Sequence, residues 1–422
     1  MKKQIVSTLL VTITIYFFGL VSSIIVSRYL SVIDRGILNS IFLFISSVVV
    51  VSQLGFSKSF IFYKRKYVNN RNSNKIIRTL FFIVVLVSFV FSIGVINKFG
   101  FYKNEFLIVP MAILYSAYVF LNSITKQNKN MQLYNISRLT VCFFILLIYV
   151  FLIIFKITLS MDVILFVHLT VYFLISTVLY KLVSIKEAKL EESGTSFQYK
   201  ILFFYTFNSY GSEIFGFIIV NIDKFFILYV SDYFSYGLYV VAFSASRLIS
   251  IIPHTVSSVI FSKFSGSSSK ELQWVSNMSF SILFIPLSFF SIIFSSFSSY
   301  ILPFIYGEKY IDAAFVFSLL VIECFFSSLS WMLSQRFIAT GRPGVIFFRQ
   351  LLSSFPIIFL VFYMPDYPFI YVITWAVLLS SILRFFLTIM MYPFVLTEEI
   401  PPIYPSRKQR ILVYNAVFNE KK

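Results

Sequence analysis

Apolar runs of about 20 residues alternate with short polar segments, most of them basic, along the whole chain. An α-helix rises about 1.5 Å per residue, so about 20 apolar residues cross a hydrocarbon core about 30 Å thick. Twelve runs have this length, with approximate limits of 5–26, 37–57, 77–97, 106–125, 138–155, 161–182, 201–222, 236–260, 276–299, 313–334, 345–364 and 368–393. The pattern therefore predicts an all-α polytopic membrane protein with about 12 transmembrane helices.

The composition favours the same class of protein. Of the 422 residues, 59% are hydrophobic and only 12% are charged, whereas soluble globular proteins contain about 25% charged residues. The first run follows Lys2 and Lys3 and exceeds the roughly 7–15-residue core of a signal peptide, so we interpret it as a membrane helix. Cys142 and Cys324 lie in apolar runs and match neither a disulfide framework nor a metal-ligand spacing. We expect no metal and no cofactor.

Basic residues between the runs predict how the chain is oriented. If both termini are cytoplasmic, the inner segments hold 26 of the 35 Lys and Arg residues, and the outer loops hold seven. Membrane proteins keep such an excess in their cytoplasmic loops. The cluster Lys58–Arg78 is the strongest cytoplasmic signal and is expected to contact anionic lipid head groups. The net charge of +18 is split among short clusters without an RNA-binding motif, which argues against a nucleic-acid partner.

Short sequence similarities about 200 residues apart predict two related halves. Tyr29–Ser31 followed by Gly36 resembles Tyr229–Ser231 followed by Gly237, and Phe56–Lys58 resembles Phe261–Lys263. Six spans per half give two six-helix lobes related by a pseudo-two-fold axis along the membrane normal, which suits alternating access around a central site. The expected parts are an N-terminal lobe (1–185), a cytoplasmic linker (186–200), a C-terminal lobe (201–395) and a cytoplasmic tail (396–422).

Four expected spans from residue 201 onward carry charged residues on faces that also hold small polar ones. These residues are Glu213 and Asp223, Arg247 and His254, Glu323, and Arg384. A charged residue in a membrane span normally faces a partner or a hydrated pathway, because its burial in hydrocarbon costs about 2.5–3.5 kcal/mol on insertion scales. Under one hypothesis, Arg–Glu pairs only hold the helices together.

Under the other hypothesis, the charged residues line a hydrated central cavity that attracts an anionic substrate. Arg247, Arg384 and His254 would then bind the substrate, and Glu213, Glu323 and Asp223 are candidates for ion coupling. His168 is expected to be a packed residue. The chain has no GxSxG, HExxH, P-loop or His/Cys cluster, and no outer loop exceeds about 15 residues. An enzyme such as an O-antigen polymerase, which needs a large outer loop, is therefore disfavoured.

Several short motifs occur in the order found in a known family. They are Ser27–Leu30 with Asp34–Gly36, Asp223–Phe225 followed by Gly237–Ala242, Leu302–Tyr310, and Gly341–Pro343. In this order the chain resembles the O-antigen and capsule repeat-unit flippases, the polysaccharide transport branch of the multidrug/oligosaccharidyl-lipid/polysaccharide exporter superfamily. The matches extend over nearly the whole chain. The lipid II flippase branch usually has more spans and the drug exporters are less basic, so both fit less well.

The resemblance implies a bacterial inner-membrane protein that exports an undecaprenyl-pyrophosphate-linked oligosaccharide, as in O-antigen or lipopolysaccharide assembly. It also implies alternating access, ion coupling of the antiport type, and contacts with membrane lipids and other polysaccharide-assembly proteins. The family-motif residues are Arg28, Lys224, Gly307 and Gly341. A small-molecule exporter of the same superfamily remains an alternative.

Overall fold

The computed structural model describes residues 2–56, 60, 73–99, 105–125, 132–188, 199–264, 269–340, 342–363 and 368–405. These residues are helical apart from short turns, and none of them lies in a strand. Among the described residues, eleven helical stretches are long and apolar enough to cross a membrane, and they match eleven of the twelve expected spans. The remaining expected span, 201–222, lies in the continuous helix α8 (Tyr199–Val230), which carries Glu213, Asp223 and Lys224.

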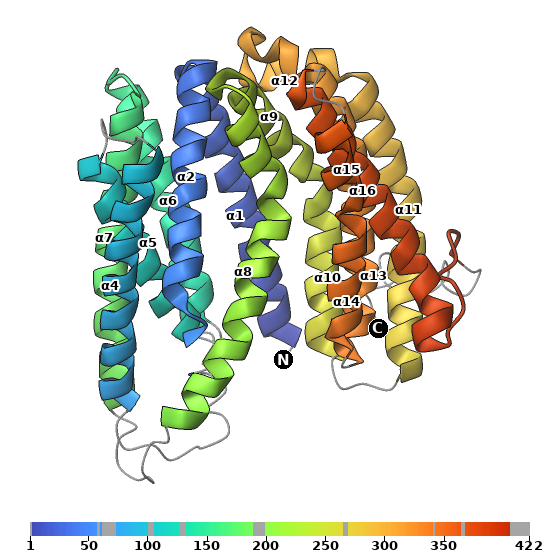
Figure 1. Cartoon of the computed structure of the whole chain (residues 1–422), viewed down its shortest axis with the longest axis horizontal. Helices are drawn as coiled ribbons and strands as arrows, with labels where there is room; N and C mark the ends of the chain where they lie inside the picture. Colours follow the sequence, from blue (N-terminus) through green and yellow to red (C-terminus); the bar gives the residue numbers. More distant parts are fainter. Residues whose placement is uncertain are drawn as a thin grey trace, which may run out of the picture. The chain divides into compact units, whose positions relative to one another are not determined.

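The chain divides into two compact units, Met1–Ile222 and Asp223–Lys422. The N-terminal unit contains α1 (Lys2–Tyr29), α2 (Val32–Gln53), α4 (Ser73–Phe99), α5 (Glu105–Thr125), α6 (Gln132–Ile154), α7 (Met161–Ala188) and most of α8. Within it, α5 packs against α4 and α7, α2 packs against α4 and α5, and α1 packs against α6 (Figure 1). The lobe limits, the linker and the symmetry axis expected from the sequence stay predictions. Parts of the expected cytoplasmic loops, linker, motif and tail lie outside the described residues. These parts are 57–59 and 61–72, 189–198, 341 and 406–422.

The turn between α1 and α2 is closed by its own side chains. Ser31 is the N-cap residue of α2. Its Oγ accepts a hydrogen bond from the Asp34 N–H at 3.0 Å and donates one to Asp34 Oδ2 at 2.6 Å. Such a cap satisfies backbone donors that the first turn of a helix leaves without partners. The cap fixes the start of α2 and so positions Arg35 in its first turn.

The C-terminal unit is built around α13. Its elements are α9 (Tyr233–Ser246), η2 (Arg247–Ser250), α10 (Ile251–Phe264), α11 (Ser269–Ser296), α12 (Ser298–Tyr306), η3 (Glu308–Ala313), α13 (Ala314–Ala339), α14 (Pro343–Ser353), α15 (Phe355–Tyr363), α16 (Phe369–Met391) and η4 (Tyr392–Leu396). The span that contains α13 is the most buried candidate span, and α13 packs against α9, α10, α11 and α16 (Figure 1). Side chains on α13 can therefore reach groups on several neighbours.

Two expected continuous spans are interrupted. The span expected at 236–260 is divided into α9 and α10 by the 3₁₀ turn η2, which begins at Arg247. Pro253 has no N–H to donate to the Ile249 carbonyl, and its ring crowds that carbonyl, so the α-helical ladder cannot continue regularly through this region. The span expected at 345–364 is similarly divided into α14 and α15 around Ser354, just before Pro356. Arg247 lies in the first interruption, between two helices of the C-terminal unit.

The segment after α16 is attached to the end of α13. Arg336 is fully buried and forms an ion pair with Glu398, and Arg342 donates a hydrogen bond to the Val395 carbonyl. Ser281 Oγ on α11 donates to the Pro402 carbonyl at 2.5 Å. Residues that follow the last span are therefore part of the packed C-terminal unit.

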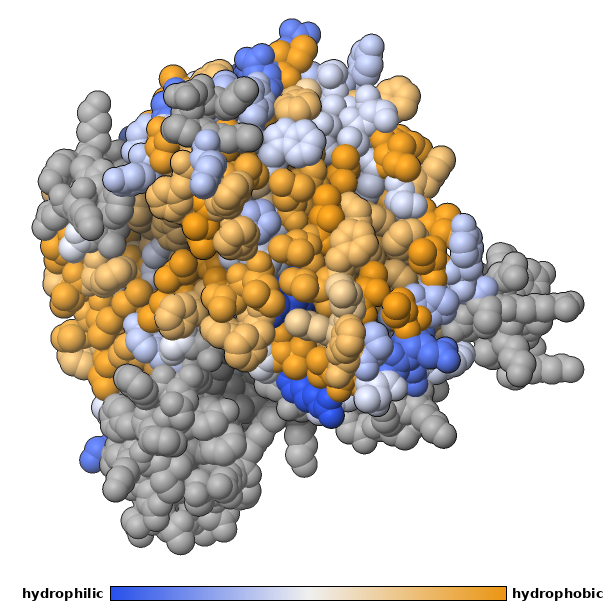
Figure 2. All heavy atoms as spheres, turned by 45° about the vertical axis from the view of Figure 1, so that its right-hand side comes forward, coloured by the Kyte–Doolittle hydropathy of each residue, from blue (hydrophilic) through white to orange (hydrophobic). Residues whose placement is uncertain are grey.

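Large apolar side chains are exposed on the helices. They include Phe106 and Tyr229, which are 92% and 89% exposed. On the face shown in Figure 2, hydrophobic residues cover most of the middle, and hydrophilic residues gather toward the upper and lower ends. An apolar surface of this extent is unstable in water and is typical of a protein surrounded by hydrocarbon.

Candidate functional site

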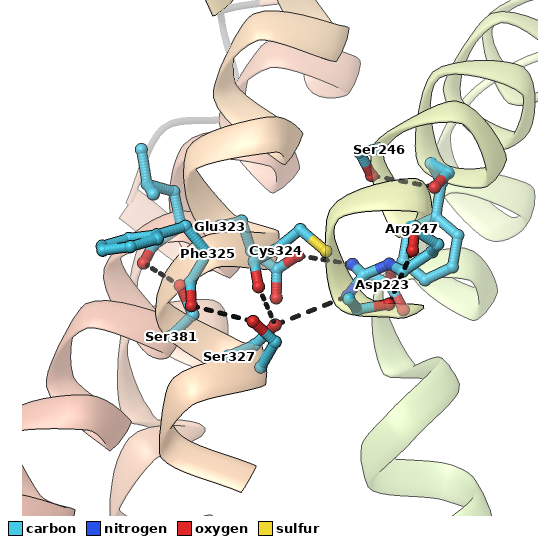
Figure 3. A network of polar contacts seen from close by, with 12 residues as sticks. Asp223, Ser246, Arg247, Glu323, Cys324, Phe325, Ser327 and Ser381 are labelled. Atoms are coloured by element: carbon cyan, nitrogen blue, oxygen red, sulfur yellow. Dashed lines mark hydrogen bonds and ion pairs between the residues drawn. The ribbon is translucent and has the colours of Figure 1, made fainter. Parts of the chain in front are cut away.

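Arg247 lies at the break between α9 and α10 and reaches across to α13. It forms an ion pair with Glu323 and donates to Ser327 Oγ at 3.5 Å (Figure 3). The Glu323 side chain is only 5% exposed, whereas that of Arg247 is 29% exposed. Arg247 therefore has one side in a buried ion pair and another that remains accessible.

The ring of Phe243 contacts two cations. Arg247 Cζ lies 4.0 Å from the ring centroid, and Lys224 Nζ lies 4.3 Å from it. The negative face of an aromatic ring attracts a cation by about 0.5–2 kcal/mol, depending on how far the pair is desolvated. Phe243 therefore helps to hold the end of α8 and the start of η2 together.

Asp223 supplies a second carboxylate. It is 4% exposed and accepts a hydrogen bond from the Tyr239 hydroxyl at 2.5 Å. Lys224 interacts electrostatically with Asp223, Arg247 and Glu323. The C-terminal part of α8 thus contributes one carboxylate and one ammonium group to the same polar region, and Figure 3 draws Asp223 in the same network of polar contacts as Arg247.

Arg384 on α16 interacts electrostatically with Glu323, Arg247 and Asp223. Its Nε donates to Ser353 Oγ at 3.3 Å. We name Asp223, Lys224, Arg247, Glu323, Arg349 and Arg384 the charged cluster. It combines four cations with two carboxylates, and it lies entirely in the C-terminal unit.

Arg349 is the member of the charged cluster that the sequence did not reveal. It lies on α14, is 1% exposed, and donates to Thr388 Oγ1 at 2.9 Å and Ser330 Oγ at 3.2 Å. It interacts electrostatically with Arg384. A signal was present, because Arg349 and Ser353 share a helical face at a spacing of four residues. The hydroxyl partner Thr388 could not be deduced, because it belongs to another helix.

The other residues selected from the sequence have different surroundings. His254 lies on α10, its ring centroid is 6.1 Å from that of Trp331, and it interacts electrostatically with Arg247. Glu213 belongs to the N-terminal unit, where it interacts with Tyr210. Arg28 is exposed in the last turn of α1. Their roles in binding or coupling stay predictions.

Gly307 has a structural reason to be glycine, and Gly341 lies outside the described residues. Gly307 joins α12 to η3 with φ 106°, a conformation that a side chain disfavours. The turn holds Tyr306 and Tyr310 fully buried on either side. In the described part of the chain, no group of three or more His, Cys, Asp or Glu residues is placed to hold a metal ion.

Asp232 lies between α8 and α9 and fixes the start of α9. Its Oδ1 accepts a hydrogen bond from the Ser235 N–H at 2.9 Å. This hydrogen bond, together with a second from the Ser235 hydroxyl, lowers the pKa of the Asp232 carboxyl below its ordinary value. A charged N-cap therefore anchors the half-helix that ends at Arg247.

These features define an α-helical membrane protein whose fold is shared with lipid and drug transporters of known structure. The chain is similar to the lipid II flippase MurJ in an inward closed conformation, with a TM-score of 0.69 and 16% identity over 98% of this chain and 92% of that one. It is also similar to a mutant of the MATE transporter VcmN from Vibrio cholerae, with a TM-score of 0.61 and 12% identity over 94% of this chain and 96% of that one. An inward-facing multidrug resistance MATE family transporter of the MOP superfamily gives a TM-score of 0.63 and 12% identity over 92% of this chain and 99% of that one.

The chain belongs to the Polysaccharide biosynthesis protein family, whose sequence model matches residues 25–315. No sequence of a curated protein matches it. The resemblance inferred from the sequence is thus confirmed for the family and the fold.

Proposed function

We propose that this protein is a flippase that moves an undecaprenyl-pyrophosphate-linked oligosaccharide across a bacterial inner membrane by alternating access. Its family membership supports a role in polysaccharide biosynthesis, and its fold is one that serves lipid and drug transport in other proteins. The observation that carries the proposal is the charged cluster, in which cations outnumber carboxylates inside an apolar helical unit. The substrate named here carries a pyrophosphate, which needs such an excess of positive charge.

Arg247 and Arg384 would bind the anionic group of the substrate. In the described residues, the hydrogen bonds of the Arg384 side chain go to hydroxyl groups rather than to a carboxylate. Its charge is therefore not neutralised by a direct ion pair there. Arginine presents a planar set of donors that matches phosphate and carboxylate oxygens. The attraction between the guanidinium group and such an anion is strong where little water is present.

Glu323 would compete with the substrate for Arg247. While Glu323 is ionised, it occupies one side of the guanidinium in the ion pair. A proton on Glu323 would weaken that pair and release Arg247 toward the substrate, which couples binding to proton movement. Asp223 and Glu213 are further candidates for ion coupling, and His254 is a candidate substrate contact near Arg247.

The proposed location is a bacterial inner membrane with both termini cytoplasmic, in contact with membrane lipids and with other polysaccharide-assembly proteins. The protein would act as a transporter and not as an enzyme. The second candidate is a small-molecule exporter, which the similarity to MATE structures favours. The excess of arginine in the charged cluster opposes it for cationic drugs, because like charges repel.

The test uses the purified full chain in proteoliposomes with a fluorescent lipid-linked oligosaccharide as one substrate and a cationic dye as the other. We expect movement of the oligosaccharide and none of the dye. The double variant Arg247→Ala with Arg384→Ala should lose this movement, and Lys309→Ala, an exposed lysine at the turn after α12, should retain it. Dye transport without oligosaccharide movement would instead identify a small-molecule exporter.

A further inference from the structure

A cavity of about 280 Å³ lies among four helices of the N-terminal unit and shares no residue with the charged cluster. It is lined by residues of α1, α2, α6 and α7, among them Ser23, Arg35, Asn39, Tyr149 and His168. All four helices belong to the same compact unit. We name this space the N-terminal cavity.

The N-terminal cavity contains a buried positive charge. Arg35 is 6% exposed, and its Nη2 donates to Ser23 Oγ at 3.0 Å. Asn39 Nδ2 donates to the Arg35 carbonyl at 2.7 Å, which fixes the neighbouring turn of α2. The residues that line the cavity include no Asp or Glu. An anion that entered the cavity would be attracted to this guanidinium group, because a low dielectric strengthens the interaction between opposite charges.

Two further polar atoms at the N-terminal cavity have no hydrogen-bond partner among the described residues. They are Tyr149 Oη and His168 Nδ1, and Tyr149 is only 1% exposed. Their rings are neighbours, with centroids 6.3 Å apart. Buried polar atoms in folded proteins are nearly always hydrogen-bonded to protein, water or ligand. A phenol hydroxyl and an imidazole nitrogen can both donate to an anionic oxygen.

We propose that the N-terminal cavity binds a small oxyanion, namely a carboxylate or phosphate group. Arg35 supplies the charge, and Tyr149 with His168 supplies two donors that the protein itself leaves without acceptors. Hydrogen bonds from such donors to an ionised oxygen are stronger than those between neutral groups. The proposal is independent of the transport function, because it concerns binding within one unit. A carboxylate would come from an acidic sugar, and a phosphate from a lipid head group or a free phosphate.

The experiment measures binding to the purified full chain in lipid nanodiscs. Inorganic phosphate and glucuronate are titrated separately, with sodium chloride at equal ionic strength as the reference, and the thermal unfolding midpoint and calorimetric heat are followed. Arg35→Gln removes the charge, His168→Phe removes both ring nitrogens, and Tyr149→Phe removes one hydroxyl. Tyr118→Phe is the matched control, because Tyr118 is buried beside Tyr172 but does not line the cavity.

At least one of the two probes should raise the unfolding midpoint of the wild-type protein more than chloride does. Tyr149→Phe should weaken that binding roughly tenfold, since each hydrogen bond to a charged group has about this effect. Arg35→Gln should abolish binding, and Tyr118→Phe should leave it unchanged. A response to glucuronate alone assigns the site to acidic sugars, and a response to phosphate alone assigns it to phosphate groups.

The absence of binding by both probes would overturn the proposal. The same holds if binding is equally strong in Tyr149→Phe and in the control, because the hydroxyl is then bound only by water. If Arg35→Gln does not accumulate in the membrane, Tyr149→Phe still decides the question. Replacing Tyr with Phe removes one hydroxyl and leaves the packing of the ring intact.

Discussion

Lys224 and Arg247 place their positive charges against one aromatic ring, that of Phe243, at 4.3 Å and 4.0 Å from its centroid. Two cations so close together repel each other. The ring face and the carboxylates of Asp223 and Glu323 offset this repulsion. The ring and the two carboxylates thus keep two cationic side chains close together in the C-terminal unit.

The first prediction concerns Phe243. Phe243→Leu keeps an apolar side chain but removes the π face, so both cation–π contacts are lost, each worth about 0.5–2 kcal/mol. We expect a lower thermal unfolding midpoint and weaker binding of the lipid-linked oligosaccharide. Phe284→Leu is the control, because the ring of Phe284 contacts those of Phe280 and Phe325 and, among the described residues, forms no cation–π contact. Equal effects of the two variants would show that only general packing is involved.

The second prediction separates substrate binding from helix packing at Arg247 and Arg384. Lysine keeps the charge but not the planar donor fork, so Arg→Lys should retain partial transport and Arg→Ala should lose most of it at normal abundance. If the Arg247–Glu323 pair only holds helices together, Arg247→Ala will lower membrane abundance by leaving Glu323 buried without its partner. Adding Glu323→Gln would then restore abundance. Surface polysaccharide and protein level, measured together, decide between these results.

The third prediction concerns ion coupling by Glu213 and Glu323. Gln has nearly the same shape as Glu but does not titrate. We expect Glu323→Gln to remove the pH dependence of transport, because it fixes Arg247 in a state without an ionised partner. Transport in proteoliposomes with an imposed proton gradient measures this effect. If Glu213→Gln and Glu323→Gln both transport at the wild-type rate and with the wild-type pH dependence, the two carboxylates only contribute to helix packing.

The fourth prediction concerns the N-cap Asp232. Asp232→Ala should lower the free energy of unfolding by about 1 kcal/mol, the usual value for an N-cap. The pKa of Asp232 is lower in the folded protein than its ordinary value of 3.8. Its charge therefore stabilises the fold above pH 3.8, and this stabilisation is lost as pH falls through the folded pKa.

Asp232→Asn provides the control, because asparagine can cap a helix without titrating. Thermal unfolding of the variants is measured from pH 3 to pH 7, roughly the range in which an aspartate titrates. It checks both the contribution of the cap to stability and the dependence of that contribution on pH. Asp232→Asn should reduce the loss of stability at low pH. An identical pH profile in wild type and Asp232→Asn would contradict a titrating cap.

The fifth prediction is the orientation of the chain. The excess of basic residues in one set of loops predicts that both termini lie inside the cell. Cysteines introduced at positions 70 and 190 should resist an impermeant reagent added to intact cells, and a cysteine at position 308 should react. Labelling of position 70 from outside would reverse the proposed orientation.

Much of the fold could be predicted, because span length and hydropathy are local properties of the sequence. The interruption of the helix at Arg247 could not be predicted. Pro253 indicates that the helix is disturbed nearby, but it does not show that the 3₁₀ turn begins at Arg247. Buried arginines were also missed. The sequence analysis singled out neither Arg336 nor Arg349, and both are buried. Their partners Glu398 and Thr388 lie on other segments, and helical periodicity describes only the helix to which a residue belongs.

The break at Arg247 also has a consequence for biogenesis. Glu323 follows Arg247 by 76 positions in the chain. At a synthesis rate of roughly 5–20 residues per second, Arg247 leaves the ribosome roughly 4–15 s before Glu323. The ion pair between Arg247 and Glu323 can therefore form only after α13 has been made, so the order of residues along the chain sets when this contact of the C-terminal unit is completed.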